Sequence, residues 1–434
     1  MQKLLFFWSK LKSTFWFIPV LIIALSIVLA LGLVYLDSLI EIRREGFARF
    51  LFIESTDSAR SILTTISGAM IGVAGTVFSI TLVALTLASS QFGPRLVKNF
   101  MYDHLNQVVL GSYISTYIYC LIILNTISDS TPIPSLSILL AMLAAIANII
   151  LLIIFIHHIA ISIQADTVIA NIAETMTKNL KKLFPETENG AADEKMTTDI
   201  EAIKSGYTIK QSIKNKKTGY LQYIDNEKII HSASELKCLV ELHIRPGDYL
   251  VANSEYGIIY SHKLIEKQDM AKLKDQFFAG NTRTHQQDPE NTIHQMVEIA
   301  ARALSPGVND PYTAITCVDN LTTTMIYFTS VKFPSIYHFD EDNNLRLISN
   351  TYSFESMLDV AFNQIRQFSK GSPSVVIRLL EALIKINKSA EQESHKKAIT
   401  KHAKMILNMA KASFDEPNDL EDLLERSTQI LDEN

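Results

Sequence analysis

Residues 61–94 read SILTTISGAMIGVAGTVFSITLVALTLASSQFGP and contain no Asp, Glu, Lys or Arg. About 20 apolar residues are enough to cross the ~30 Å hydrocarbon core of a bilayer, so this stretch is long enough to span one. Between residues 61 and 90, however, 17 of 30 residues are Gly, Ala, Ser or Thr. The stretch therefore predicts a membrane helix with an unusual surface rather than a purely apolar anchor.

One face of this predicted helix is small and hydroxylated. At ~100° per residue, a narrow stripe along it contains eight positions, of which only Val83 is neither Gly, Ser nor Thr. The other seven are Thr65, Gly68, Gly72, Thr76, Ser79, Thr86 and Ser90. Such a stripe favours either water or the close approach of another backbone, and Gly68 and Gly72 have the spacing of a helix-packing motif.

Three further segments are free of charged residues over a comparable length, at residues 13–36, 104–128 and 130–165. Their apolar centres lie at residues 18–34, 108–124 and 136–156. Together with residues 61–94 they predict four transmembrane helices. Lys and Arg number eight on the side of the two termini (Lys3, Lys10, Lys12, Arg95, Lys98, Lys178, Lys181, Lys182) and four on the other (Arg43, Arg44, Arg49, Arg60). Because cytoplasmic segments carry the excess of basic residues, both termini are expected in the cytoplasm.

The fold class expected is an α-helical membrane protein with a cytoplasmic region made of a small β-barrel-like segment and a C-terminal helical domain. The domains expected are a membrane domain (1–165), a helical extension with a polar linker (166–200), a β-rich domain (201–275) and a helical domain (276–434). Period-two patterns predict strands at residues 219–224, 228–230, 239–244 and 249–251. Helical patterns follow at residues 293–304, 311–328, 354–368, 373–386 and 393–412.

A loop motif, SPGVNDPYTA, occupies residues 305–314. Pro306 and Gly307 are typical of a helix end, Asp310 is a good N-cap and Pro311 suits the first position of the next helix. The structural interpretation is thus that one helix ends in this loop and the next helix begins there. The functional alternative is that the helix start, with Asn309 and Asp310, binds an anion or a ligand carboxylate. A polar cluster that begins at Arg283 lies close in sequence, and Arg283 is included in this candidate ligand-binding set.

Several classes of function are disfavoured by composition. The net charge of −5 makes nucleic acid an unattractive partner, and three scattered cysteines predict neither a disulfide framework nor a structural zinc. We expect no cofactor and no metal. A hydrolase could be assembled from His285, Asp288 and Glu298, but no nucleophile motif accompanies them, so no enzymatic activity is expected. The predicted spans contain no acid or base, which argues against a transporter coupled to an intramembrane carboxylate.

The chain resembles a bacterial family of predicted integral membrane proteins of unknown function, of the DUF2254 type. The resemblance is carried by residues 13–19 (STFWFIP), 57–60 (DSAR), 77–92 (VFSITLVALTLASSQF), 93–100 (GPRLVKNF), 156–159 (IHHI), 245–248 (RPGD) and 303–314 (ALSPGVNDPYTA). It implies four membrane helices with a cytoplasmic domain. It implies no chemistry, and no functional residue is carried over from it.

Two functions from different classes remain open. In the first, the protein is a homo-oligomeric channel for small ions, in which Thr65, Gly68, Gly72, Thr76, Ser79, Thr86 and Ser90 line the pore and the cytoplasmic domain regulates it. Four helices are too few to enclose a water path alone, so several copies must contribute their second helices. In the second, the protein is a non-conducting sensor or scaffold, the stripe is a dry helix–helix seam, and the cytoplasmic domain binds a partner or ligand.

Overall fold

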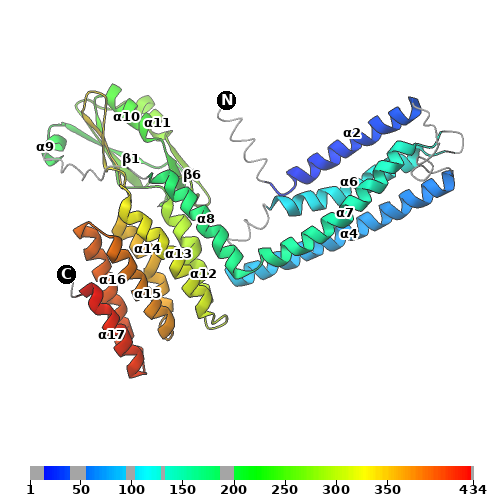
Figure 1. Cartoon of the computed structure of the whole chain (residues 1–434). Coiled ribbons are helices and arrows are strands. Elements are labelled where there is room, and N and C mark those ends of the chain that lie inside the picture. Colours follow the sequence, from blue (N-terminus) through cyan, green and yellow to red (C-terminus); the bar gives the residue numbers. More distant parts are fainter. Residues whose placement is uncertain (1–13, 40–54, 94–102, 129–131, 186–199, 432–434) are drawn as a thin grey trace. The chain divides into compact units, whose positions relative to one another are not determined.

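The computed structural model describes residues 14–39, 55–93, 103–128, 132–185 and 200–431. The chain divides into two compact units, Met1–Val168 and Ile169–Asn434 (Figure 1). The predicted polar linker, at residues 186–195, lies outside the described residues.

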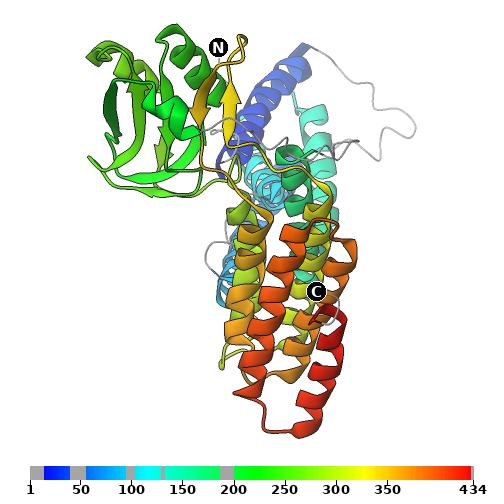
Figure 2. The same ribbon diagram turned by 90° about the vertical axis from the view of Figure 1, so that its left-hand side faces the viewer.

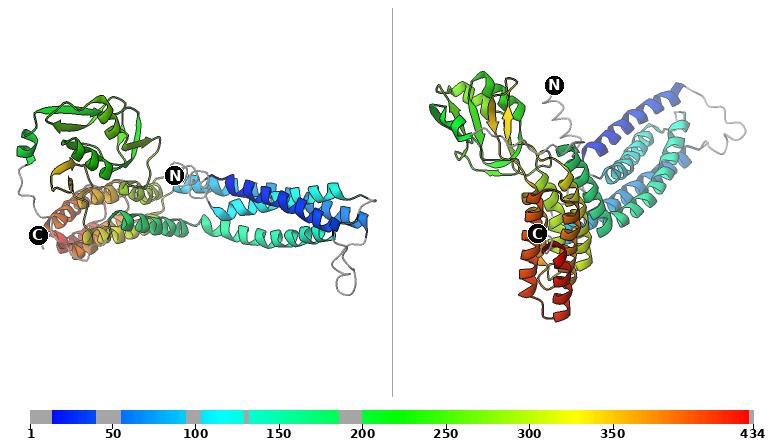
Figure 3. Two further views of the ribbon diagram at one scale, coloured as in Figure 1. Left: turned by 90° about the horizontal axis from the view of Figure 1, so that it is seen from above. Right: turned by 60° about the vertical axis from the view of Figure 1, so that its left-hand side comes forward.

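The first unit is a bundle of helices that run side by side (Figure 3). Four of its described helices are long and apolar enough to cross a membrane: α2 (Phe17–Leu39), α4 (Thr56–Phe92), α6 (His104–Thr126) and α7 (Ser135–Ser162). Each contains one predicted span, so the prediction of four apolar helices of membrane-spanning length is confirmed. Helices α6 and α7 each pack against the other three, and the contacts of α6 with α2 and α4 are the most extensive.

Charged side chains stabilise the ends of these helices. The carboxylate of Asp37, near the end of α2, accepts hydrogen bonds from the backbone N–H groups of Leu136 and Ser137 at 3.0 and 2.9 Å. The guanidinium of Arg60 donates to the carbonyl oxygen of Ile127, just after α6, at 3.2 Å. A carboxylate at a helix start meets the partial positive charge there, and a guanidinium at a helix end meets the partial negative charge, so both contacts are stabilising.

A buried polar cluster ties the middle of the bundle together. Asn148 of α7 accepts a hydrogen bond from the Ser112 hydroxyl at 2.6 Å and donates to the Thr116 hydroxyl at 2.9 Å. The backbone carbonyl oxygen of Asn148 accepts a hydrogen bond from the Tyr113 hydroxyl at 2.6 Å. These bonds to α6 satisfy the buried amide, as apolar surroundings demand.

The second unit begins within α8 (Ala165–Leu183), an amphipathic helix whose buried side includes Ile172, Met176 and Leu180. Six further helices form a bundle, seen side by side in Figure 2. They are α12 (Pro289–Ala303), α13 (Pro311–Ser330), α14 (Phe354–Phe368), α15 (Pro373–Ser389), α16 (Glu393–Lys411) and α17 (Pro417–Leu431). Helix α8 packs on α13, where the Thr324 hydroxyl donates to the sulfur of Met176 at 3.8 Å. Just after α8, Phe184 meets Phe328 edge to face with ring centroids 5.5 Å apart. The five predicted helices of this region are confirmed within a few residues.

The same unit contains two β-sheets rather than one closed barrel. The larger has the order β1-β5-β3-β8-β7 and the smaller the order β4-β2-β6. The strands are β1 (Ile209–Lys214), β2 (Gly219–Ile224), β3 (Leu239–Leu242), β4 (Tyr249–Leu250), β5 (Glu255–Ser261), β6 (Phe277–Gly280), β7 (Tyr337–Phe339) and β8 (Leu345–Ile348). All pairs are antiparallel except β3 with β8, where Val240 lies opposite Leu347. Strands from both sheets contribute to one buried core, which includes Ile213, Leu221 and Leu347.

Three short helices complete this part of the unit: α9 (Ile200–Ser205), α10 (Asn226–Glu235) and α11 (Lys267–Lys274). Helix α10 corrects the strand predicted at residues 228–230. Asp225 is the N-cap of this helix and accepts a hydrogen bond from the backbone of Lys228 at 3.2 Å. Ile229 and Ala233 then share the buried face while His231 between them is exposed, which fits a helix and not a strand, where alternate residues share a face.

Candidate functional site

The small, hydroxylated stripe of α4 lies on the surface of the first unit. All seven residues predicted to line a pore are exposed in the single chain: Thr65, Gly68, Gly72, Thr76, Ser79, Thr86 and Ser90. A side chain built on Gly68 or Gly72 would meet no other atom within 4 Å. The stripe is therefore not a seam within the bundle of one chain.

The opposite face of α4 explains this orientation. Met70, Ala74 and Val77 are buried at 5%, 4% and 1% exposure, and they share a core with residues of α6 and α7. Apolar side chains gain most from burial, so the apolar face turns inward and leaves the small face outside.

The hydroxyl groups of the stripe bond back to their own helix. Thr65 donates to the carbonyl oxygen of Ser61 at 2.8 Å, and Ser79 donates to that of Gly75 at 2.9 Å. Thr76 and Thr86 do the same over four residues, and Ser90 over three. Each hydroxyl proton is thus already in a hydrogen bond to the backbone, while the oxygen lone pairs can still accept a hydrogen bond from water or another molecule.

The stripe is also long. Helix α4 has 37 residues, about 55 Å at ~1.5 Å per residue, which exceeds the ~30 Å hydrocarbon core of a bilayer. From Thr65 to Ser90 the rise is about 38 Å. Apart from the exposed Val83, the small face therefore extends over a distance greater than the thickness of the hydrocarbon core.

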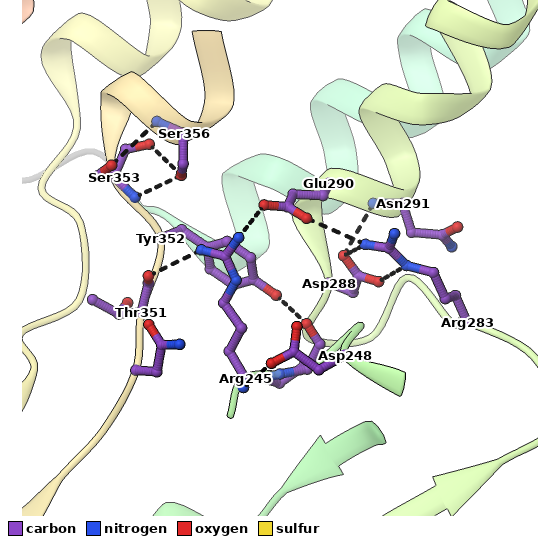
Figure 4. Close-up of polar contacts among 12 residues, drawn as sticks. Arg245, Asp248, Arg283, Asp288, Glu290, Asn291, Thr351, Tyr352, Ser353 and Ser356 are labelled. Carbon is purple, nitrogen blue, oxygen red and sulfur yellow. Dashed lines mark hydrogen bonds and ion pairs between the residues drawn. The ribbon is translucent and has the colours of Figure 1, made fainter. Parts of the chain in front are cut away.

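A second candidate site lies in the second unit, where the turn of residues 245–248 meets the start of α12 (Figure 4). The guanidinium of Arg283 forms a two-point ion pair with the carboxylate of Asp288, at 2.6 and 2.8 Å, and reaches Glu290 at 3.5 Å. Arg245 pairs with the other oxygen of Glu290 at 2.5 Å. Two arginines from different segments therefore converge on the first turn of α12.

This cluster also includes the ring of Tyr352. The guanidinium of Arg245 stacks over that ring at 4.5 Å, and the Tyr352 hydroxyl donates to the carbonyl oxygen of Pro246 at 2.5 Å (Figure 4). Gly247 has φ +98°, and a Cβ there would lie 2.6 Å from a carboxylate oxygen of Asp288. Only glycine lets the turn pack this closely on the ion pair.

Burial governs the electrostatics of the cluster. Burial opposes the charge of Arg283, but the carboxylates of Asp288 and Glu290 outweigh it, so the pKa of Arg283 lies above its ordinary value. Burial raises the pKa of Glu290, although Arg245 and Arg283 act in the opposite direction. Both guanidinium groups are occupied by carboxylates, so the cluster is best suited to joining the β-sheet region to α12.

The three residues predicted to bind a ligand do not come together. Arg283 lies before the first residue of α12, whereas Asn309 and Asp310 follow its last residue, and these 15 residues extend about 22 Å. Asn309 is exposed and has φ +50°. Asp310 is the N-cap of α13, accepting from the backbone and hydroxyl of Thr313 at 3.1 and 2.5 Å. The predicted end of one helix and start of the next in this loop are both confirmed. Ligand binding by these residues stays a prediction.

The residues of the conceivable hydrolase have other partners. Asp288 pairs with Arg283 and also caps α12 through the backbone of Asn291. The ring of His285 contacts the side chains of Thr292 at 3.1 Å, Asn291 at 3.2 Å and Gln295 at 3.3 Å. Burial lowers the pKa of His285, so its ring is neutral at neutral pH.

Sequence reasoning missed Glu290 and Tyr352 as members of the cluster. An acidic residue in the first turn of a helix is an ordinary signal of helix stabilisation, and it could have drawn attention to Glu290. Tyr352 is 106 residues from Pro246, the residue to which it donates, and no local pattern indicates that contact.

Comparison with known proteins identifies a family of predicted membrane proteins and uncharacterized mycobacterial relatives. The family described as "Predicted membrane protein (DUF2254)" matches residues 12–385. The uncharacterized protein Mb1321c of Mycobacterium bovis is 28% identical, and the match covers 97% of this chain and 81% of the relative. The uncharacterized protein Rv1290c of Mycobacterium tuberculosis matches with the same identity and coverage. No solved structure matches the chain significantly.

Proposed function

Because the chain belongs to the DUF2254 family of predicted membrane proteins, we propose that it works within a bacterial inner membrane, as a homo-oligomeric channel for small ions. In this proposal the α4 stripes of several copies surround a common pore. The second unit lies in the cytoplasm and regulates the pore. No enzymatic step is part of the proposal.

The observation that carries the proposal is the exposed stripe of α4. Its small residues face away from the helices of their own chain, and its length exceeds the thickness of the hydrocarbon core. A local helix contact needs only a few small residues, whereas a water path needs a polar face across the whole membrane. Hydroxyl oxygens and exposed backbone at Gly68 and Gly72 could then replace part of the hydration shell of an ion.

The same stripe also supports the second candidate, a non-conducting sensor or scaffold. The open space above Gly68 and Gly72 lets another backbone approach closely, as in small-residue helix pairs. In that case two copies would bury the stripes against each other without water. Both functions require an oligomer. They differ in whether the α4 stripe contacts water in a pore or is buried against another copy.

Conductance of the purified protein in planar bilayers tests the channel. We expect current in the wild-type protein, and Gly72→Leu or Ser79→Leu should lower the unit conductance by narrowing the pore. Gly32→Leu on α2 is the matched control, because Gly32 is also exposed and has no atom within 4 Å of a built Cβ. Absence of current in every salt and voltage tested, or equal effects of Gly72→Leu and Gly32→Leu, would contradict the proposal.

Cysteine labelling separates the two candidates. The native Cys120, Cys238 and Cys317 are all buried, so their reaction with a charged thiol reagent should be slow. We expect Thr76→Cys and Ser79→Cys to react in a pore, and Phe78→Cys, exposed on an adjacent face, to stay unreactive in lipid. Rapid disulfide cross-linking between copies at Ser79→Cys without reagent access would favour the dry seam.

A further inference from the structure

A pocket of about 1090 Å³ opens in the second unit, between β7, the segment before α14 and the start of α16. Its walls are rich in aromatic rings: Tyr207, Phe333, Tyr337, Phe339, Tyr352 and Phe354. Ligand pockets typically enclose ~300–1,000 Å³, so this one is large enough for a small molecule. Flat rings bind most favourably between such aromatic walls.

One polar side chain of the wall lacks a partner. His395 is only 6% exposed, and its Nδ1 atom is buried without any hydrogen bond among the described residues. The ring stacks on Phe354, with centroids 4.1 Å apart and planes 27° from parallel. Neither ring nitrogen has a hydrogen bond among the described residues, and because Nδ1 is inaccessible, Nε2 is the nitrogen that can pair with a molecule in the pocket.

The start of α16 adds a second polar feature to the same wall. Gln392 and Ser394 also line the pocket, and this helix of 19 residues receives no side-chain hydrogen bond at its N-cap. A helix N-terminus carries partial positive charge and favours an anionic group. By contrast, the start of α14 is closed by a capping box between Ser353 and Ser356.

Charged residues on the walls are already neutralised. Arg346 pairs with Asp340 at 2.6 Å, and Glu355 pairs with Lys401 at 2.9 Å. Burial lowers the pKa of His395, so its ring is neutral at neutral pH and offers one donor and one acceptor nitrogen. The carboxylate of Glu393, the first residue of α16, lies 3.8 Å from the ammonium of Lys396, so an incoming anion meets the helix start and a polar ring with that carboxylate already paired.

We propose that this pocket binds a small molecule with a planar aromatic ring and one anionic group, the ring against the aromatic walls and the anion at the start of α16 beside His395. Mononucleotides and aromatic carboxylates share this chemistry. The proposal goes beyond the channel, because binding to the second unit can be measured whether or not the protein conducts.

Isothermal titration of the full-length protein in detergent tests the site, with AMP and salicylate as probes and adenosine and inorganic phosphate as their controls. We expect AMP, salicylate or both to bind, and adenosine and phosphate to bind at least about tenfold more weakly. AMP alone would identify a nucleotide site, and salicylate alone a carboxylate site. No binding of either probe up to about 10 mM, or equal binding of adenosine, would overturn the proposal.

Two variants place the binding in this pocket. His395→Phe keeps the stack on Phe354 and removes both ring nitrogens, so thermal stability should be unchanged or higher while affinity falls about tenfold. If His395 had only a structural role, His395→Phe would not lower the affinity while leaving the thermal stability unchanged. Ser394→Trp should fill the pocket and abolish binding. Ser389→Trp is its matched control, since Ser389 is exposed at the end of α15 and does not line the pocket. Unchanged affinity in both His395→Phe and Ser394→Trp would refute the site.

Discussion

The carboxylate of Asp37 on α2 caps α7 through Ser137, accepting from its backbone N–H at 2.9 Å and from its hydroxyl at 2.6 Å. The residue at the N-cap position of α7 is Pro134, which makes no side-chain hydrogen bond to the helix. The cap of α7 is therefore supplied by a different helix, 100 residues earlier in the chain. It fixes the relative position of the two helices as well as the helix end.

Replacement of Asp37 by Ala should destabilise the first unit by about 2 kcal/mol, the upper range for a lost N-cap. The reason is that Leu136 and Ser137 lose the acceptor for their backbone N–H groups. Thermal unfolding in detergent would measure the loss. Asp57→Ala is the control, since Asp57 is exposed in the first turn of its own helix. Equal effects of the two substitutions would argue against a cap between helices.

The helices of this protein could be predicted closely because their signals are local. The helix Phe354–Phe368 was predicted with the bounds that the structure has, and Pro311 marks the start of α13 in both. Hydropathy and cap residues suffice for this, since both act over one or two turns. In the same way, the stripe of α4 could be placed on one face from sequence alone.

The long-range contacts could not be predicted in this way. The pairing of β3 with β8 joins Val240 to Leu347, and nothing near either residue indicates the other. The sequence likewise could not say whether the α4 stripe faces inward, because that depends on how well its opposite face packs on α6. Arg283 was grouped with Asn309 by nearness in sequence, whereas a helix of 15 residues separates them.

The ion pair of Arg283 with Asp288 should be important for the stability of the second unit. Asp288 is only 1% exposed, so removing its partner leaves a buried carboxylate uncompensated. We expect Arg283→Gln to cost about 3–5 kcal/mol, the range for a broken buried pair. Chemical denaturation followed by circular dichroism would measure it.

A second variant of this pair separates charge from packing. Asp288→Asn added to Arg283→Gln removes the unpaired charge and should recover a large part of the loss, since neutral pairs cost less to bury. Additive losses in the double variant would show that the two side chains act independently.

Stability of the second unit should fall as the pH drops below about 6.5, the ordinary pKa of histidine. Burial lowers the pKa of His285, His338, His395 and His402. The unfolded chain therefore binds more protons than the folded chain between the lowered pKa values and about 6.5, and the free energy of unfolding rises with pH in that window. Denaturation midpoints at pH 7.5 and 5.5 would show the difference.

His402 offers a way to assign part of this pH dependence. Its ring contacts the carboxylate of Asp359 at 3.0 Å, with Lys401 and Arg366 also nearby, and burial is the dominant influence on its pKa. His402→Gln keeps a donor toward Asp359 but cannot bind a proton, so the midpoints at the two pH values should move closer together. A larger difference in His402→Gln would contradict the assignment.

Asn148 should contribute modestly to the stability of the membrane bundle despite its full burial. Asn148→Leu removes its bonds with the hydroxyls of Ser112 and Thr116, but the Tyr113 hydroxyl donates to the backbone of residue 148 and keeps its acceptor. The hydroxyl of Thr116 also donates to the carbonyl oxygen of Ser112 at 2.9 Å, so it is not left without a partner. We therefore expect a loss of about 1 kcal/mol, as for other hydrogen bonds between membrane helices. Unfolding by SDS titration of Asn148→Leu, Thr116→Val and the double variant would give their coupling energy. A coupling near zero would mean that the amide acts through packing, because the hydrogen bond between the two side chains would then contribute nothing.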